Sequence, residues 1–295
     1  MEHQADVIIV GTGVAGLFCA LQLPKELHIL MITKDKAEHS DSYLAQGGIS
    51  TLRTPEDYDS YFEDTMRAGH YKNNPDSVDV MIRSSPQIIQ NLIDFGVEFE
   101  RTSDGLSYTR EGAHSTFRIL HHKDITGYEI TSKLMAQVQQ RPYIHIEEYT
   151  SMVDIIEQNH VCTGVVVRTK DGQIQPIYAK SVVLATGGLG GLFQNSTNYP
   201  HITGDALAIA LKHHIALQDI NYIQIHPTTL YSEKKGRSFL ISESVRGEGA
   251  VLLNEKGERF VDELLPRDVV TKAIKDEMKK TNAKFVYLSM EHMGA

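Results

Sequence analysis

The hydrophobic pattern at the start of the chain predicts a strand, a glycine turn, a helix and a second strand. Residues 6–10 form a short β-branched run typical of a buried strand, and residues 11–16 carry three glycines. A helix-like apolar stretch follows and ends at Pro24, after which residues 27–32 form a second apolar run. The first 33 residues therefore predict one βαβ unit.

The rest of the chain continues this alternation of helices and strands. Helix starts are predicted at Thr54 and at Asn74, each followed by a proline, and the second of these helices should end at Gly96. The other predicted elements are, in chain order, a helix over 127–140, β runs over 144–149, 151–157 and 161–169, a hairpin turn at Asp171-Gly172 before a fourth run, a buried strand over 181–185, and helices over 205–214 and 267–280. Residues 101–124 are polar and irregular, which is compatible with a mobile loop or with a functional site.

Length and composition indicate a folded, soluble protein of about two domains. The chain has 295 residues, of which 41% are hydrophobic and 23% charged, and these proportions exclude a disordered protein. A net charge of −9 argues against nucleic acid or an anionic membrane as a partner. The apolar run over residues 7–21 is too short to span a bilayer and lacks a basic start. Two distant cysteines, Cys19 and Cys162, suggest neither disulfides nor zinc, so a cytoplasmic location is expected.

The glycine turn has the spacing and the context of a dinucleotide-binding motif. Gly11-x-Gly13-x-x-Gly16 follows a predicted strand and opens a predicted helix. Gly11 permits a tight turn, Gly13 lets backbone amides approach a pyrophosphate, and Gly16 allows close helix–strand packing. The helix N-terminus adds a positive dipole for the phosphate charge. A purely structural glycine turn is the alternative interpretation.

Two further features bear on which dinucleotide would bind. Thr33-Lys34 stands where an acid would bind a ribose hydroxyl, which argues against plain NAD binding. A second strand-to-glycine turn ends in Ala185-Thr-Gly-Gly188. Two such turns on either side of a β-rich middle are typical of FAD enzymes, although the second turn alone would be interpreted as an ordinary strand end.

Together these motifs resemble the flavoprotein family of succinate dehydrogenase, fumarate reductase and L-aspartate oxidase. They occur in the family's order as Gly11-x-Gly13-x-x-Gly16, Ser42-x-x-Ala45-Gln46-Gly47-Gly48, Ala185-Thr-Gly-Gly188, Thr203-Gly-Asp205, His226-Pro-Thr228, Arg246-Gly-Glu-Gly249 and Pro266-Arg-Asp268. Three further segments are similar to the aspartate oxidase branch: Thr109-Arg-Glu-Gly-Ala-His114, Arg118-Ile-Leu-His121 and Asp124-x-Thr-Gly127.

The resemblance implies an α/β fold, with a Rossmann-like FAD-binding domain of the GR2 type and an inserted α+β capping domain that is incomplete here. The FAD-binding domain is expected over residues 1–220, including a β-rich insertion over about 143–180, and residues 221–295 should begin the capping domain. Family members continue well beyond residue 295. A longer polypeptide or a partner chain should therefore supply the missing portion, and these 295 residues alone should bind FAD weakly and turn over little.

The resemblance also implies that FAD is bound non-covalently. Asp41 occupies the position at which the respiratory flavoproteins carry a histidine bonded to the flavin. The residues implied in cofactor binding are Gly11, Thr12, Gly13, Val14, Ala15, Gly16, Thr33, Lys34, Ser42, Ala45, Gln46, Gly47, Gly48, Ala185, Thr186, Gly187, Gly188 and Asp205.

The implied reaction is the oxidation of L-aspartate to iminoaspartate, the first step of NAD biosynthesis through quinolinate, with O2 or fumarate reoxidising the flavin. Glu111 would face the substrate ammonium, whereas His226 and Ser242 would donate to one carboxylate; the family more often has Thr at position 242. Arg267 would carry a proton close to the substrate or anchor the second carboxylate electrostatically. Glu243 and Arg246 would form a relay to solvent.

Taken one at a time, these residues also allow purely structural interpretations. Arg246 and Arg267 could be surface or ion-pairing arginines, His226 a half-buried structural histidine, and Glu111 a loop salt bridge with Arg110. A fumarate reductase or succinate dehydrogenase type of subunit, and a fragment that binds nucleotide without turnover, are the alternative functions. No metal is predicted, because adjacent histidines face different ways. Quinolinate synthase is implied as a partner by the pathway alone.

Overall fold

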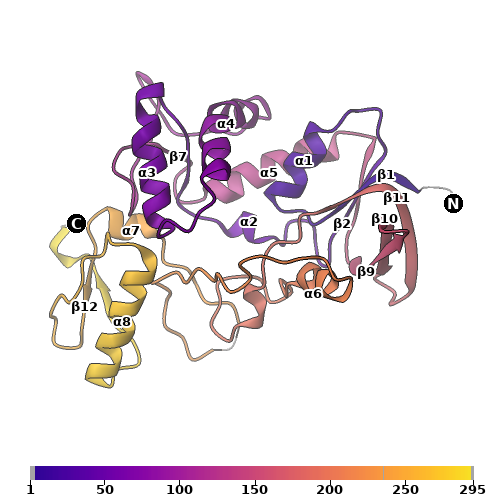
Figure 1. Ribbon diagram of the computed structural model, residues 1–295. Coiled ribbons are helices and arrows are strands. Elements are labelled where there is room, and N and C mark those ends of the chain that lie inside the picture. The colour runs from indigo at the N-terminus through magenta and orange to yellow at the C-terminus, as the bar shows by residue number, and fades with distance from the viewer. Residues whose placement is uncertain (1–3, 235, 294–295) are drawn as a thin grey trace. The chain divides into compact units, whose positions relative to one another are not determined.

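The computed structural model describes residues 4–234 and 236–293, which form two compact units (Figure 1). Unit 1 comprises Met1–Ala45, Gly127–Ile220 and Lys234–Ser238. Unit 2 comprises Gln46–Thr126, Asn221–Glu233 and Phe239–Ala295. Each unit is therefore assembled from segments that are distant in the sequence.

This division differs from the predicted domains at residues 46–126, which group with the later part of the chain instead of with the rest of 1–220. Long-range polar contacts inside unit 2 show the physical reason. Ser242 Oγ donates to Asp124 Oδ1 across 118 positions, and His70 Nε2 lies 3.0 Å from Asp268 Oδ2 across 198 positions. No local pattern of apolar residues reports such pairings.

A six-stranded sheet organises unit 1, in the order β8-β2-β1-β11-β10-β9. The four parallel strands are β1 (Ala5–Val10), β2 (Ile29–Ile32), β8 (Ile144–Glu147) and β11 (Ile174–Leu184). β9 (Ser151–Gln158) and β10 (Val161–Arg168) extend the sheet with antiparallel pairing. The predicted βαβ unit and the β-rich insertion thus share one sheet.

One long strand, β11, replaces two predicted ones. Its first half pairs with β10 up to Tyr178, and its second half pairs with β1 from Ala179 to Leu184. The prediction of a separate, buried strand over 181–185 was therefore wrong in two respects, because the strand is continuous and its last residue, Leu184, is 48% exposed.

Four helices and a 3-10 turn complete unit 1: α1 (Val14–Gln22), α2 (Asp41–Leu44), α5 (Thr126–Gln139), the turn Gly190–Leu192 and α6 (Asp205–Lys212). α1 ends as predicted, because Leu23 precedes Pro24 and takes an extended conformation.

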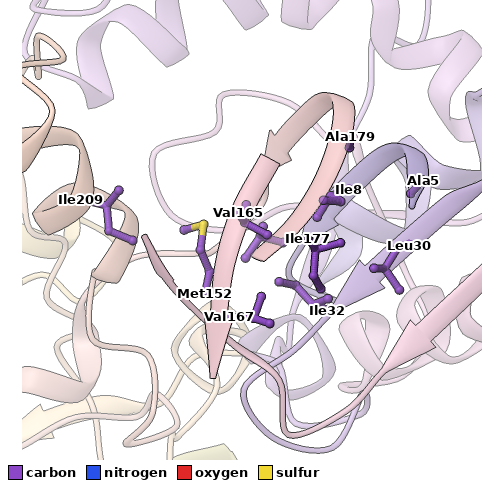
Figure 2. Packing of buried hydrophobic residues seen from close by; sticks show 11 residues of the cluster. Ala5, Ile8, Leu30, Ile32, Met152, Val165, Val167, Ile177, Ala179 and Ile209 are labelled. Atoms are coloured by element: carbon purple, nitrogen blue, oxygen red, sulfur yellow. The ribbon is translucent and has the colours of Figure 1, made fainter. Parts of the chain in front are cut away.

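The core of unit 1 joins the parallel and antiparallel parts of the sheet (Figure 2). Figure 2 shows Ile8 of β1 and Ile177 of β11 close to Val165 of β10, with Met152 of β9 between that strand and Ile209 of α6. The complete cluster is Ala5, Ile8, Val10, Leu30, Ile32, Met152, Val165, Val167, Ile177, Ala179 and Ile209. Val10 and Ile32 of this cluster are the last residues of β1 and β2, so their burial fixes the strand ends that lead into the first glycine turn and into Thr33-Lys34.

Unit 2 contains two helical layers and several short strands. Its first part consists of β3 (Gly48–Ser50), a 3-10 turn (Pro55–Asp57), α3 (Tyr58–Ala68), α4 (Pro75–Asp94), β4 (Arg101–Thr102), β5 (Gly105–Leu106), β6 (Tyr108–Thr109) and β7 (Ile119–His121). Its second part consists of α7 (Glu243–Gly247), β12 (Val251–Leu253), α8 (Arg267–Thr281), β13 (Tyr287–Ser289) and a 3-10 turn (Glu291–Met293).

Local sequence signals explain the helices of unit 2. Asn74 caps α4 by accepting a hydrogen bond from the Ser77 amide, and Pro75 is the first helical residue, as predicted. Tyr61 and Ile82 join the core between α3 and α4, whereas Val270 and Ile274 of α8 pack on β12. No helix within residues 4–234 and 236–293 is long and apolar enough to cross a membrane.

Candidate functional site

A cavity of about 310 Å³ opens in unit 1 where β1, β2 and β11 end. This is the edge of a parallel sheet at which α/β proteins bind ligands. The cavity is lined by Val10, Gly11, Thr12, Gly13, Val14, Ala15, Ile32, Thr33, Lys34, His39, Ser40, Asp41, Ser42, Thr150, Met152, Leu184, Ala185, Thr186, Gly187, His201 and Ile202. The two predicted glycine turns therefore meet in one site.

The glycines leave bare backbone at this cavity. Gly11 has a φ of +113°, and a Cβ on it would lie 2.2 Å from the carbonyl oxygen of Ala185. A Cβ on Gly16 would lie 2.2 Å from the carbonyl oxygen of Gly11, so this glycine packs the helix on the strand as predicted. A Cβ on Gly13 would come within 3.0 Å of Ser42 Oγ. Val14 and Ala15, at the start of α1, line the cavity, so the N-terminus of this helix borders it, as in an anion-binding helix terminus.

Lys34 stands at the end of β2 in place of the usual acid. Its Nζ donates to Asp205 Oδ2 at 2.8 Å and to Thr203 Oγ1 at 2.9 Å. Burial opposes ionisation of Asp205, but the hydrogen bonds from Lys34 and Thr203 outweigh it, so the pKa of the Asp205 carboxyl lies below its ordinary value. Lys34 is thereby held as a cation in the cavity wall.

The other predicted cofactor residues differ in their placement. Thr33, Ser42, Thr186 and Gly187 line the cavity, and Ser42 Oγ accepts the Val14 amide at 3.0 Å. Thr12 also lines it, although its hydroxyl donates to the carbonyl of Ala37. Ala45, Gly188 and Asp205 are not among the lining residues, and Gln46, Gly47 and Gly48 belong to unit 2.

The structure adds residues that the motifs did not indicate. Tyr199 stacks between His39 and His201, with ring centroids 5.2 and 5.4 Å apart. Ser40 Oγ is buried without a hydrogen-bond partner among the described residues. Asp41 accepts from the side chain of Asn198 at 2.6 Å, and burial raises the pKa of its carboxyl. Only proximity to Lys34 and Ser42 in the sequence could have pointed to His39 and Ser40, whereas the resemblance had already indicated Asp41.

Unit 2 gathers a second set of predicted residues around Glu243, the first residue of α7. Arg267 Nε donates to Glu243 Oε2 at 2.6 Å, and Arg267 Nη1 donates to Gln224 Oε1 at 2.8 Å. Arg246 Nη2 lies 3.7 Å from Glu243 Oε1. Glu243 therefore holds both arginines through its two carboxylate oxygens.

Arg246 is not a surface arginine. It is only 2% exposed, and its Nη1 donates to the carbonyl of Glu263 at 2.6 Å. Its Nε and Nη2 are buried and have no hydrogen-bond partner within the described residues. Burial lowers the pKa of the Arg246 guanidinium, and the negative charge of Glu243 opposes this effect. Unsatisfied donors on a buried cation are costly, so this group calls for an anionic ligand.

Glu111 is the second unsatisfied charged group of unit 2. Its Oε1 is buried without a hydrogen-bond partner in the described part of the chain. Burial and the negative charge of Glu243 raise the pKa of Glu111 to about 6, although Arg267 acts in the opposite direction. No ion pair with Arg110 is found among the described residues; Arg110 instead lies over the ring of Phe117, 5.4 Å from its centroid.

His226 and Ser242 are also in unit 2, and both already make hydrogen bonds. Burial and the charge of Arg267 lower the pKa of His226 to about 4, so its ring is neutral at pH 7. His226 Nδ1 lies 3.0 Å from the carbonyl oxygen of Thr228. Ser242 is buried, caps α7, and donates its hydroxyl proton to Asp124 Oδ1 at 2.6 Å. These contacts therefore also agree with the alternative that His226 is a half-buried structural histidine.

Comparison with known proteins identifies the family. The FAD binding domain family matches residues 6–295. The L-aspartate oxidase of Clostridium perfringens is 51% identical over 294 residues, which are 99% of this chain and 67% of that protein. The enzyme of the same name from Clostridium acetobutylicum is 49% identical, with 100% of this chain and 68% of that protein covered.

This chain belongs to the L-aspartate oxidase family of FAD-binding flavoproteins. A solved chain of Escherichia coli quinol fumarate reductase has a TM-score of 0.91 and 30% identity, with 100% of this chain and 55% of that one covered. The predicted fold class and flavoprotein family are confirmed. The chain spans about two thirds of the two clostridial oxidases and just over half of the reductase.

The same membership makes this chain a flavin-dependent oxidoreductase with FAD as its cofactor. Among residues 4–234 and 236–293, no group of three or more His, Cys, Asp or Glu side chains could hold a metal ion.

Proposed function

We propose that this flavoprotein oxidises L-aspartate to iminoaspartate, the first step of NAD biosynthesis through quinolinate, and that O2 or fumarate reoxidises the cofactor. Two relatives at 51% and 49% identity that are named L-aspartate oxidase support this proposal. The observation that carries it is Glu111, whose buried and unsatisfied oxygen lies in a unit that also contains the buried, unsatisfied Arg246. L-Aspartate has a cationic group for Glu111 and an anionic group for Arg246, so it could satisfy both.

The cavity of unit 1 fits the diphosphate of FAD. Bare glycine backbone, the amides at the start of α1 and the cation of Lys34 are the groups that a dinucleotide phosphate needs. Asp41 cannot form the bond to flavin that a histidine forms, and its carboxylate already binds Asn198, which supports non-covalent binding. When bound, FAD supplies the acceptor for a hydride from the substrate carbon, which no side chain can supply.

The residues of unit 2 can bind and orient the substrate. Glu111 would face the ammonium, since an isolated buried carboxylate gains most from a cationic ligand. His226, being neutral, donates from one nitrogen only. To donate to a substrate carboxylate from Nε2, His226 must accept at Nδ1 from the Thr228 amide at 3.3 Å instead of donating from Nδ1 to the Thr228 carbonyl oxygen at 3.0 Å.

Arg267 suits the role of an electrostatic anchor for the second carboxylate. Glu243 and Gln224 fix its guanidinium by accepting hydrogen bonds from Nε and Nη1. A guanidinium has five N–H donors and no acceptor, so it suits the binding of a carboxylate better than the role of a base. Glu243 and Arg246 would then serve mainly to hold this anchor. The alternative role of the same two residues is to relay a proton between the substrate and solvent.

The proposal is tested by mixing L-aspartate with the FAD-loaded protein in the absence of oxygen. We expect the visible absorption of the flavin to disappear as iminoaspartate forms. The proposal would be contradicted if a strong chemical reductant removed the flavin absorption and L-aspartate did not. The same assay on these 295 residues and on a polypeptide as long as the relatives tests the expectation of weak FAD binding and little turnover in the shorter chain.

Glu111→Gln separates the two enzymatic candidates. An aspartate oxidase should lose the use of L-aspartate far more than the reduction of fumarate, because only aspartate carries an ammonium. Equal losses would favour a fumarate reductase or succinate dehydrogenase type of subunit instead. A protein that binds FAD and responds to neither ligand would be a nucleotide-binding fragment without turnover.

The proposed setting is the cytoplasm, with quinolinate synthase as the partner that consumes the unstable product. Cys19 and Cys162 are both free and only partly exposed, which suits a reducing compartment. The partner is supported by the order of the pathway, in which the product of one enzyme is the substrate of the other.

A further inference from the structure

Asp124 and Thr126 hold Gly47 from two sides, although neither has a role in the proposed reaction. Asp124 Oδ1 accepts from the amide of Gly47 at 3.3 Å. Thr126 Oγ1 donates to the carbonyl oxygen of Gly47 at 2.5 Å and accepts from the amide of His122 at 2.9 Å. Thr126 is buried, and its only proton is committed to Gly47.

The position of Gly47 controls the space around Glu111. Gly47 has a φ of +64°, in the left-handed region, and a Cβ on it would lie 2.6 Å from Glu111 Oε1. The oxygen that lacks a partner therefore lies directly against the bare α-carbon of Gly47. A small shift of this glycine would change the room available to any group that binds Glu111.

Asp124 connects the same glycine to Ser242. One oxygen, Oδ1, receives both the amide of Gly47 and the hydroxyl of Ser242, the latter at 2.6 Å. Ser242 Oγ also accepts from the amide of Ser244 at 3.3 Å, so its side chain is fixed at the start of α7. Through Asp124, the segment that borders Glu111 is tied to the helix that carries Glu243.

We propose that Asp124 and Thr126 are positioning residues for substrate binding. They fix Gly47 and Ser242 around Glu111, so that the Glu111 carboxylate stays open to the ammonium of an amino-dicarboxylate. The inference rests on the proposed role of Glu111, and its test must separate a failure of that role from a failure of the positioning.

Thr126→Val tests the hold on the carbonyl of Gly47, because it keeps the shape of the side chain and removes its hydroxyl. Without this hydrogen bond the Gly47 carbonyl loses its donor and the segment beside Glu111 is less firmly held, so the KM for L-aspartate should rise about tenfold. Thr126→Ser should restore KM. Fumarate has no ammonium, so its dissociation constant, measured from the flavin spectrum, should change less than about twofold.

Thr131→Val is the matched control. Thr131 is also buried, but its hydroxyl donates to the carbonyl of Gly127 within α5 at 2.7 Å. This variant should keep the KM of the wild type. Equal losses for L-aspartate and fumarate in Thr126→Val, or a loss in Thr131→Val as large as in Thr126→Val, would overturn the proposal by showing a general effect on the fold.

Asp124→Asn tests the link to Ser242. Its amide oxygen can still accept from Gly47, but a neutral acceptor holds the Ser242 hydroxyl less tightly, so the KM for L-aspartate should rise about threefold. If Asp124 acts through Ser242, Asp124→Asn should add little in a Ser242→Ala background. Additive losses would refute the link. If the wild type itself failed to respond to L-aspartate, the proposed function would fail instead, which the fumarate titration distinguishes.

Discussion

Acidification should weaken the binding of L-aspartate through Glu111. The pKa of this carboxyl is raised to about 6 by burial and by Glu243. Above that pH the carboxylate is ionised and attracts the substrate ammonium, whereas below it the neutral acid does not. The KM for L-aspartate should therefore be low and constant near pH 8 and should rise as the pH falls through 6.

The size of the effect follows from the ionised fraction. One pH unit below the pKa, about a tenth of Glu111 is ionised, so KM at pH 5 should be about tenfold higher than at pH 8. His226 cannot produce this rise, because the pKa of His226 is lowered to about 4 and its ring stays neutral in this range. Its protonation at still lower pH would add a positive charge and would favour a dicarboxylate.

The assay is the steady-state KM for L-aspartate from pH 5 to 8 at constant ionic strength. Glu111→Gln should have a high KM that does not change over this range, and the fumarate dissociation constant of the wild type should lack the rise centred at pH 6. A flat KM in the wild type, or the same pH dependence in Glu111→Gln, would refute the assignment of Glu111 to the ammonium.

Two further substitutions test the other charged contacts. Glu243→Gln removes the anion that faces Arg267 and the buried Arg246. The free energy of unfolding in denaturant should therefore fall by about 3 kcal/mol, and kcat/KM should fall at least about tenfold. An unchanged free energy of unfolding would contradict the ion-pair account. Lys34→Met removes a cation from the cavity wall and leaves Asp205 with Thr203 but without its ion-pair partner, so flavin fluorescence titration should show FAD binding weakened about tenfold. Lys36→Met changes an exposed lysine two positions away and should leave FAD binding intact.

The cofactor half of the protein could be predicted because its signals are local. The order strand, glycine turn, helix and strand occupies 33 consecutive residues, and each glycine has a backbone role that its spacing already implies. The same reasoning failed at β11, where two apolar runs form one strand because they pair with different neighbours. Sequence spacing reports which residues are apolar, but not which strand they pair with.

The long-range contacts within each unit could not be predicted in this way. Asp124 was known only as part of a motif, yet its carboxylate joins positions that lie 77 and 118 residues away in the sequence. The stack of Tyr199 between His39 and His201 likewise depends on tertiary structure alone. Such contacts become visible only when the chain is folded, because no periodicity relates their members.

The charge state of Glu111 shows why a motif can identify a site residue without giving its chemistry. In the sequence, Glu111 is followed by Gly112 and preceded by an arginine, which suggests an ordinary surface salt bridge. In the structure, Arg110 turns to Phe117, and Glu243, whose Oε1 would lie 2.9 Å from a Cβ on Gly112, adds negative charge nearby. The resulting pKa depends on burial and on charges from separate segments. The capacity of Glu111 to receive a cation therefore arises from the tertiary fold of unit 2, and a substitution at Glu243 should alter it even though that residue is 132 positions away.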